Sequence, residues 1–169
     1  MLFPVAALVV ASQEEAGDLL RRWGHKMGPC DRPAGFGMWC HVLQHEGRPV
    51  ALTVTAALVR ECVGGGLGHL TRQNTVELAR VCAVRPGLCR AMLRLWRELV
   101  FPGLGYSHAI SYQDAALHRC DLYRFDGWRR LAATRASGTD RRSGRKGRPR
   151  VVWGWQLPTP SPEGGFLEG

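Results

Sequence analysis

NTVELARVCAVRPGLCRAMLRLWRELVFPGLGYSHAISY, residues 74–112, is the stretch of the sequence that decides the fold. It opens with the apolar, β-branched pattern of a strand, continues over residues 85–100 as a helix and closes with a second strand at 107–112. Apolar side chains recur along the helix at i, i+4, i+7, i+8 and i+11, at Leu88, Met92, Leu95, Trp96 and Leu99. Strand, helix and strand in this order predict a parallel β-α-β crossover.

Upstream of this unit the sequence predicts a strand, a helix and a hairpin. The apolar start of the chain predicts a buried strand, and a capping-box signature begins a helix over about residues 13–23. Residues 37–56 form two strand-like arms around a tight turn at Glu46-Gly47, which predicts a β-hairpin. The glycine-rich residues 62–75 contain no complete phosphate-binding loop and predict a flexible connection.

Downstream, a second helix is expected over roughly residues 114–124, ended by Asp126-Gly127. A short strand at 128–132 and a final strand at 151–157 complete the pattern. The sequence therefore predicts one mixed α/β (α+β) domain over residues 1–156, with a central mixed sheet flanked by helices. The proline- and glycine-rich residues 157–169 predict a disordered tail.

Charge, cysteine content and hydropathy indicate the kind of partner and the cellular compartment of the protein. The net charge of +9 and the pI of about 10.0 indicate attraction to a polyanion, for which nucleic acid is the commonest partner. The six cysteines include no CxxC pair. They are predicted to be small core residues of a protein in the reducing cytoplasm. No segment reaches about eighteen uninterrupted apolar residues, so neither a membrane-spanning helix nor a membrane partner is expected.

A basic loop between the last two strands concentrates this charge. The loop contains a single acidic residue, Asp140. Its basic residues are Arg135, Arg141, Arg142, Arg145, Lys146, Arg148 and Arg150. They favour a clamp on the phosphates of double-stranded DNA, with sequence-independent and salt-sensitive affinity. The alternative is a solvated loop without function.

The order of elements resembles that of a GNAT-like acyltransferase domain. In that fold the connection from the fourth strand into the next helix receives the pyrophosphate of acyl-coenzyme A, which the free amides of a helix N-terminus can bind. The matching positions here are Arg85, Gly87, Leu88 and Arg90. The family pattern [RQ]-x-x-G-x-[GA] is incomplete, because its second glycine is absent and Arg90 stands where a small residue is usual.

A narrower resemblance comes from five motifs taken together. WGHKMGP, VELARVC, SYQDAALHRCDLYRFDGW, a basic SGRKGR loop and VVWGW follow one another within residues 23–155. This order is similar to that of the Mom-type DNA modification proteins of phages. The resemblance implies a GNAT-related transferase that converts the N6 amine of adenine in DNA to a methylcarbamoyl-type group, an anti-restriction activity.

The resemblance also implies site residues. The matching positions are Glu77 and Arg80 in ELAR, Ser111 and Asp114 in SYQD, Tyr123 in LYRFDGW, and His25 in the early loop. Acetyl-coenzyme A and iron are the candidate cofactors, and the residues themselves specify neither. His25 with Asp114 or Glu77 would be the iron ligands, although a single histidine in a loop is usually only solvated.

The chemistry of an adenine amine suggests roles for these residues. Asp114 could accept a proton or hydrogen-bond the amine, and could equally be an ordinary helix N-cap. Ser111 or Tyr123 could donate a hydrogen bond to a carbonyl oxygen, and Tyr112 could stack on an extruded base.

Two charged residues on the predicted strand at 74–84 raise a question of geometry. Glu77 and Arg80 are three residues apart, so they face one pocket only if a β-bulge lies between them. Arg80 would then either hold a ligand anion or form a structural pair near Glu77 or Glu61.

Two other functions fit the same sequence. One is a GNAT-like N-acetyltransferase that uses acetyl-coenzyme A to modify a small amine, with the basic loop incidental. The other is a non-catalytic DNA-binding protein that keeps the fold and the clamp. The group donor, the DNA context and the oligomeric state have no signature in the sequence.

Overall fold

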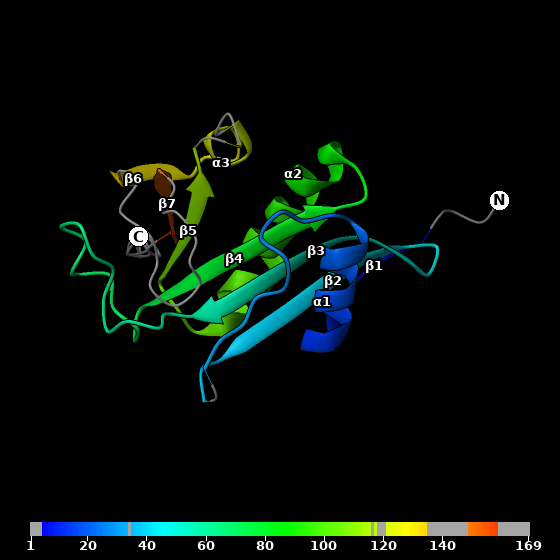
Figure 1. The fold of residues 1–169 in the computed structure, drawn as a ribbon, viewed down its shortest axis with the longest axis horizontal. Helices are drawn as coiled ribbons and strands as arrows, with labels where there is room; N and C mark the ends of the chain where they lie inside the picture. The colour runs from blue at the N-terminus through cyan, green and yellow to red at the C-terminus, as the bar shows by residue number, and fades with distance from the viewer. Residues whose placement is uncertain (1–4, 34, 116, 118–120, 135–148, 159–169) are drawn as a thin grey trace, which may run out of the picture.

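The computed structural model describes residues 5–33, 35–115, 117, 121–134 and 149–158. These residues form one seven-stranded sheet flanked by helices (Figure 1). In chain order the elements are β1 (Ala6–Ala11), α1 (Gln13–Arg22), β2 (Met38–His45), β3 (Arg48–Ala57), β4 (Thr75–Ala83), α2 (Pro86–Leu95), the π-helical turn η1 (Trp96–Val100), the 3-10 turn η2 (Phe101–Leu104), β5 (His108–Asp114), α3 (Asp121–Phe125), β6 (Arg129–Thr134) and β7 (Arg150–Gln156).

The sheet is mixed, with strand order β1-β2-β3-β4-β5-β7-β6. Only the β4–β5 pair is parallel, and the helical segment from α2 to η2 connects the two strands as the crossover. All other neighbouring pairs are antiparallel. The predicted fold class is therefore confirmed.

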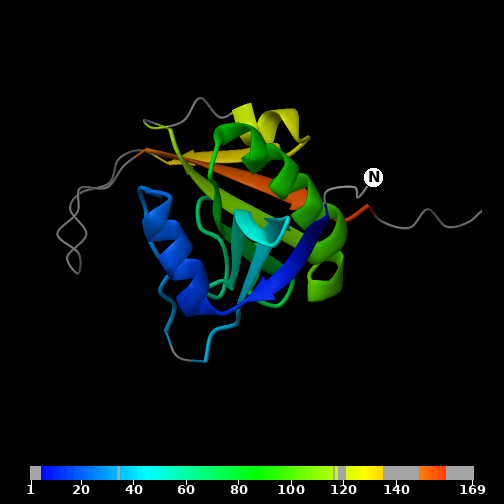
Figure 2. The ribbon, with the colours of Figure 1, turned by 90° about the vertical axis from the view of Figure 1, so that its right-hand side faces the viewer.

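Helices cover the sheet on both faces (Figure 2). On one face α1 buries Leu19 and Leu20 against β2, β3 and β4. On the other face α2 and η1 bury Leu93 and Trp96 against β4, β5 and β7, in the same cluster as α3. The hydrophobic effect therefore places the crossover helix and α3 together on one side of the β4–β5 pair.

The predicted hairpin is confirmed, with Glu46 and Gly47 as its two turn residues. Their φ angles are 51° and 74°, so both lie in the left-handed region. A two-residue turn with this geometry matches the natural twist of its strands, and glycine adopts it without a steric penalty.

Three expectations about local structure are wrong. Residues 62–75 are not a flexible connection, because Val63 and Leu70 are buried in a cluster with Ile110 of β5. The helix expected over 114–124 does not begin at 114, since β5 continues to Asp114, and the described part of this segment contains α3 at Asp121–Phe125. Leu99, expected on the buried helix face, is 64% exposed, because the π-turn brings Val100 inward instead.

The domain boundary at 156 and the disordered tail after it stay predictions, because most of the tail lies outside the described residues. Within the described part of the chain, no helix is long and apolar enough to cross a bilayer.

Candidate active site where β4 and β5 diverge

β4 and β5 pair over a short length and then separate. Their parallel register covers only Thr75↔His108, Val76↔Ala109 and Glu77↔Ile110. Beyond these residues β4 continues to Ala83 beside β3, whereas β5 continues to Asp114 beside β7. Figure 1 shows the two strands opening like a V. From Leu78 onward, the main chain of β4 on this side lies outside the β4–β5 ladder. The Leu78 carbonyl accepts from Ser111 Oγ, and the Ala79 carbonyl accepts from Arg80.

A β-bulge at Ala79 turns Glu77 and Arg80 toward the same side. Val54 of β3 pairs with Arg80 but the next residue, Thr55, pairs with Leu78, which leaves Ala79 as the extra residue. Both side chains then meet the loop that follows α1. Glu77 forms an ion pair with Arg32, and Arg80 donates to the carbonyls of Gly28 and Pro29 at 2.9 and 3.3 Å.

These contacts give Arg80 a structural role in the described structure. Its guanidinium also donates to the carbonyl of Ala79, and Glu61 pairs with Arg72 instead. Burial lowers the pKa of Arg80, opposed mainly by the charges of Cys30 and Glu77. Arg80 therefore fastens the loop to the sheet beside the divergence, and the predicted role as a ligand-binding residue stays untested.

The Arg32–Glu77 pair supports a prediction about stability. Both side chains are only 16% exposed, so Arg32→Ala would leave a largely desolvated carboxylate and is expected to cost about 2 kcal/mol of unfolding free energy. Urea denaturation measures this loss. Arg94→Ala, which breaks a pair with 69% and 53% exposed side chains, is the matched control and should change stability far less. Equal effects of the two variants would contradict the prediction.

Ser111 and Tyr123 meet at the apex of the divergence. Ser111 is the first β5 residue beyond the parallel register, and its Oγ lies 2.8 Å from the carbonyl oxygen of Leu78 on β4. The Tyr123 hydroxyl from α3 lies 2.7 Å from the same Oγ. Burial raises the pKa of Tyr123 to about 12, against the lowering effect of the Ser111 hydrogen bond. Tyr123 therefore keeps its proton at neutral pH.

Aromatic packing fixes the Tyr123 ring. Trp153 of β7 stacks on it at a centroid distance of 5.9 Å, and Trp128 meets it edge-on at 5.2 Å. Trp153 is itself oriented by a hydrogen bond from its Nε1 to Gln113 at 2.8 Å. The phenol has little rotational freedom, so its hydroxyl stays directed at Ser111.

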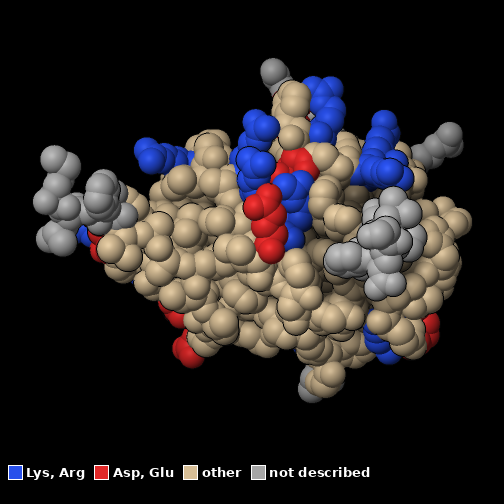
Figure 3. All heavy atoms as spheres, turned by 180° about the vertical axis from the view of Figure 1, so that it is seen from behind, with Lys and Arg blue, Asp and Glu red and all other residues tan. Residues whose placement is uncertain are grey.

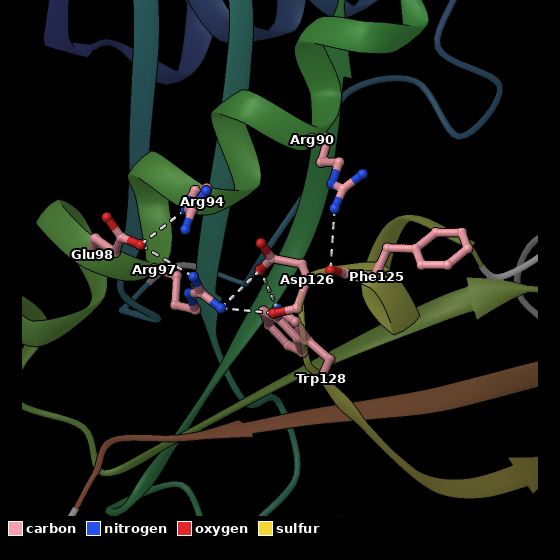
Figure 4. A network of polar contacts seen from close by, with 7 residues as sticks. All are labelled: Arg90, Arg94, Arg97, Glu98, Phe125, Asp126 and Trp128. Atoms are coloured by element: carbon pink, nitrogen blue, oxygen red, sulfur yellow. Dashed lines mark hydrogen bonds and ion pairs between the residues drawn. The ribbon is translucent and has the colours of Figure 1, made fainter.

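A polar network joins α3 to the crossover helix (Figure 4). Arg97 of η1 donates to the carbonyl of Asp126 at 2.6 Å and pairs with its carboxylate at 3.5 Å. Trp128 Nε1 donates to the same carboxylate, and Arg90 of α2 reaches the carbonyl of Phe125 at 3.4 Å. Burial raises the pKa of Asp126, whereas Arg97 and the Trp128 hydrogen bond lower it. The network ties the element carrying Tyr123 to α2.

The first turn of α2 is suited to an anion. No side chain caps it and it contains no acidic residue, so its N–H groups and positive dipole end are not neutralised locally. Gly87 is exposed, with nothing within 4 Å of the position of a Cβ atom. Arg85 at the N-cap of α2, Arg90 on α2 and Arg124 on α3 are exposed. Basic side chains gather along the upper edge of the molecule in Figure 3. Arg90 contacts α3 through its bond to Phe125.

Tyr112 lies on the opposite face of β5 from Ser111 and is 37% exposed. Burial raises its pKa, the charge of Glu77 adds to this, and the charges of Arg150, Arg60 and Arg32 act against it. A partly exposed aromatic side chain thus lies within electrostatic range of three arginines and one glutamate.

The other predicted residues are only partly placed. Asp114 ends β5 opposite Arg150, and so ends a strand rather than beginning a helix. His25 follows α1 and accepts a hydrogen bond from the amide of Met27. The remaining cations of the basic loop, Arg135, Arg141, Arg142, Arg145, Lys146 and Arg148, lie outside the described residues.

The described residues contain no group of three His, Cys, Asp or Glu side chains suited to one metal ion, so the structure lends no support to iron. A surface hollow lined by Leu8, Trp39, His41, Leu99 and Leu104 lies along β1, β2 and the end of the crossover helix. It shares no residue with the divergence.

Of the site residues predicted from the sequence, the structure brings Ser111 and Tyr123 into contact, and the roles of these residues and of the start of α2 stay predictions. Sequence reasoning did not assign Arg32, Arg97 or Asp126 to the site. Arg32 belongs to a proline-rich loop and Arg97 to a helix with many arginines, so their partners have no local signature.

Comparison with known proteins gives a fold. No protein-family model matches the chain, and no curated protein matches it. Among solved structures, the ribosomal-protein-S18-alanine N-acetyltransferase of Escherichia coli is similar at a TM-score of 0.60 and 15% identity, covering 96% of this chain and all (100%) of that one. An aminoglycoside acetyltransferase AAC(6')-Ib in complex with coenzyme A is similar at 0.62 and 13% identity, covering 90% and 95%.

A GNAT family acetyltransferase from Elizabethkingia anophelis with acetyl-CoA bound is similar at 0.57 and 8% identity, covering 90% and 98% of the two chains. These similarities run over nearly the whole of each chain. With the mixed seven-stranded sheet and its crossover helix, they establish that this chain has the fold of the GNAT acetyltransferases.

Proposed function

We propose that the protein is an N-acyltransferase that moves an acyl group from acyl-coenzyme A, most simply acetyl-coenzyme A, to an amine. The observation that carries this proposal is the buried Tyr123 hydroxyl at the apex of the β4–β5 divergence. It stands where the strand edge of β4 outside the β4–β5 ladder could bind an extended cofactor chain by main-chain hydrogen bonds. Two of the similar structures are described as containing coenzyme A or acetyl-CoA.

The residues of this chain suggest how such a transfer would proceed. The first turn of α2, with Arg85 beside it, would hold the pyrophosphate. The edge of β4 from Leu78 onward would hold the pantetheine and direct the thioester to the apex. The amine would attack the thioester carbonyl carbon, and Tyr123 would give its proton to the departing thiolate sulfur.

Binding of coenzyme A tests the cofactor half of the proposal. Arg85→Glu places a negative charge at the start of α2 and is expected to weaken coenzyme A binding about tenfold, or ~1.4 kcal/mol. Isothermal titration calorimetry measures the dissociation constant. Arg22→Glu, on the exposed end of α1, is the control and should bind as the unmodified protein does. Equal affinities of all three proteins would refute the placement of the pyrophosphate.

Activity tests the other half. The protein is incubated with acetyl-coenzyme A and a panel of amines that includes small amines, peptides and DNA, and the release of free thiol is followed. Acetylation of any amine, lost in Tyr123→Phe, would support the proposal. Coenzyme A binding without transfer to any of these amines, or to water, would count against an enzyme.

A second candidate acceptor is the N6 amine of adenine in double-stranded DNA. The observation that favours it is Tyr112, a partly exposed aromatic ring within electrostatic range of Arg32, Arg60 and Arg150, because aromatic rings stack on bases and arginines bind phosphates. Arg150 also begins the strand that follows the basic loop. A methylcarbamoyl-type product is the form expected from the Mom-type resemblance.

Mass spectrometry of nucleosides from DNA of expressing cells distinguishes these readings. A heavier deoxyadenosine, absent from cells expressing Asp114→Ala, would assign the DNA acceptor and a required carboxylate. Unmodified DNA together with salt-sensitive DNA binding would favour the non-catalytic DNA-binding alternative. Unmodified DNA and acetylation of a small amine would leave the simpler acetyltransferase.

A further inference from the structure

Ser111 has two acceptors within reach and one proton to give. Its Oγ lies 2.8 Å from the Leu78 carbonyl oxygen and 2.7 Å from the Tyr123 hydroxyl. A carbonyl oxygen can only accept a hydrogen bond. When Tyr123 is neutral, the Ser111 proton therefore goes to Leu78, and the Tyr123 proton goes to Ser111 Oγ.

The pair is shielded from solvent. Ser111 is 2% exposed and Tyr123 is 7% exposed. If Tyr123 gives up its proton, a phenolate is left in a site where burial strongly disfavours charge. Among the contacts of the described residues, Ser111 is the hydroxyl placed to donate to that phenolate.

Resting on the acyl transfer proposed above, we infer that Ser111 is a positioning residue whose hydroxyl switches acceptors during the reaction. It donates to the Leu78 carbonyl while Tyr123 is protonated, and turns to donate to the Tyr123 phenolate once the proton has left. The switch needs only rotation about the Cβ–Oγ bond, because both acceptors are already at hydrogen-bond distance.

The proton and electron balance of the step is complete. The amine nitrogen forms a bond to the acyl carbon, the carbon–sulfur bond breaks, and the sulfur takes the bonding pair. The Tyr123 O–H bond breaks and an S–H bond forms, which leaves a phenolate that Ser111 stabilises. The positively charged nitrogen of the new amide then loses its proton, directly or through water, and this proton restores the phenol.

A purely structural serine predicts the opposite shift of the Tyr123 pKa. If Ser111 only bridges the strands and accepts from the neutral phenol, its removal destabilises the neutral form and lowers that pKa. If Ser111 turns to the phenolate, its removal takes away a charge-assisted bond, which is the stronger kind, and raises the pKa. The direction of the change therefore separates the two roles.

The first experiment needs no substrate. A fluorinated tyrosine, which has a lower intrinsic pKa, is incorporated at position 123 of the full chain and titrated by fluorine NMR. Ser111→Ala is expected to raise its pKa by about one unit. Thr55→Val removes another buried side-chain hydrogen bond, that of Trp96 Nε1 to Thr55 at 2.7 Å, and should leave the titration unchanged. A lowered or unchanged pKa in Ser111→Ala would overturn the inference.

The second experiment uses acetyl-coenzyme A and an amine that the protein acetylates. Ser111→Ala is expected to lower kcat about tenfold with little change in KM for acetyl-coenzyme A, and to cost much less in a Tyr123→Phe background. Ser111→Thr keeps the hydroxyl and should recover most of kcat. Additive losses in the double variant would contradict the switch. If no amine is acetylated, the proposed function fails, and the titration still decides the role of Ser111.

Discussion

Tyr123→Phe is expected to lower kcat for acetyl transfer by about a hundredfold, with KM for acetyl-coenzyme A nearly unchanged. Loss of a positioned proton donor typically costs a factor of this order, and the missing hydroxyl lies at the apex of the divergence rather than along the edge of β4 proposed to hold the cofactor. Steady-state kinetics at saturating amine measures both constants. The Tyr106 ring contacts Trp39 edge-on. Tyr106→Phe is the control and should keep the kcat of the unmodified protein. A fully active Tyr123→Phe would remove the tyrosine from the reaction.

The pKa of Tyr123 adds a pH dependence to this result. The group donates in its protonated form, and burial raises its pKa to about 12. The phenol is therefore intact throughout the neutral and mildly alkaline range, and no loss of kcat in this range is expected from Tyr123. A decline near the ordinary tyrosine pKa of about 10, absent from Tyr123→Phe, would contradict the burial of the hydroxyl.

Trp96→Ala is expected to destabilise the protein by about 4 kcal/mol. Trp96 is fully buried, stacks on Phe101 at a centroid distance of 5.2 Å and donates to Thr55 of β3. Its removal leaves a large cavity between the crossover helix and the sheet, together with an unpaired hydroxyl. Chemical denaturation followed by circular dichroism measures the loss of unfolding free energy.

Leu99→Ala is the informative control for Trp96→Ala. The sequence pattern places Leu99 on the buried face of the helix, whereas the structure has it 64% exposed. A change within about 0.5 kcal/mol is therefore expected, as for an ordinary surface substitution. A loss comparable to that of a buried leucine would show that Leu99 lies on the buried face of a regular α-helix, which would contradict the π-helical turn.

The sequence predicts the order of elements well because each one has a local signature. Alternation and β-branching mark the strands, a capping box marks α1, and a two-residue turn marks the β2–β3 hairpin. These signals depend on neighbours within a few residues. The π-turn at Trp96–Val100 has no such signal, because it depends on how the helix end packs against the sheet. The helix start predicted at residue 114 is wrong for a similar reason, since β5 continues to Asp114 through its pairing with β7.

The same limit applies to the candidate site: motifs indicate single residues, but not the contacts between residues far apart in the sequence. Ser111 and Tyr123 could be singled out from motifs, but their hydrogen bond joins a strand to a helix 12 residues further along the chain. Their contact follows from the divergence of β4 and β5, which no residue pattern encodes. The Arg32–Glu77 pair spans 45 residues and is equally invisible to local reasoning.

The bulge at Ala79 makes the length of β4 matter as much as its composition. Glu77 and Arg80 reach the same loop because one extra residue separates their pairing positions on β3. Inserting a single residue between them, with the bulge kept, would send one of the two charges to the face occupied by α2, although every original amino acid would still be present. For protein engineers, this segment is therefore sensitive to insertion as well as to the loss of its two charged side chains.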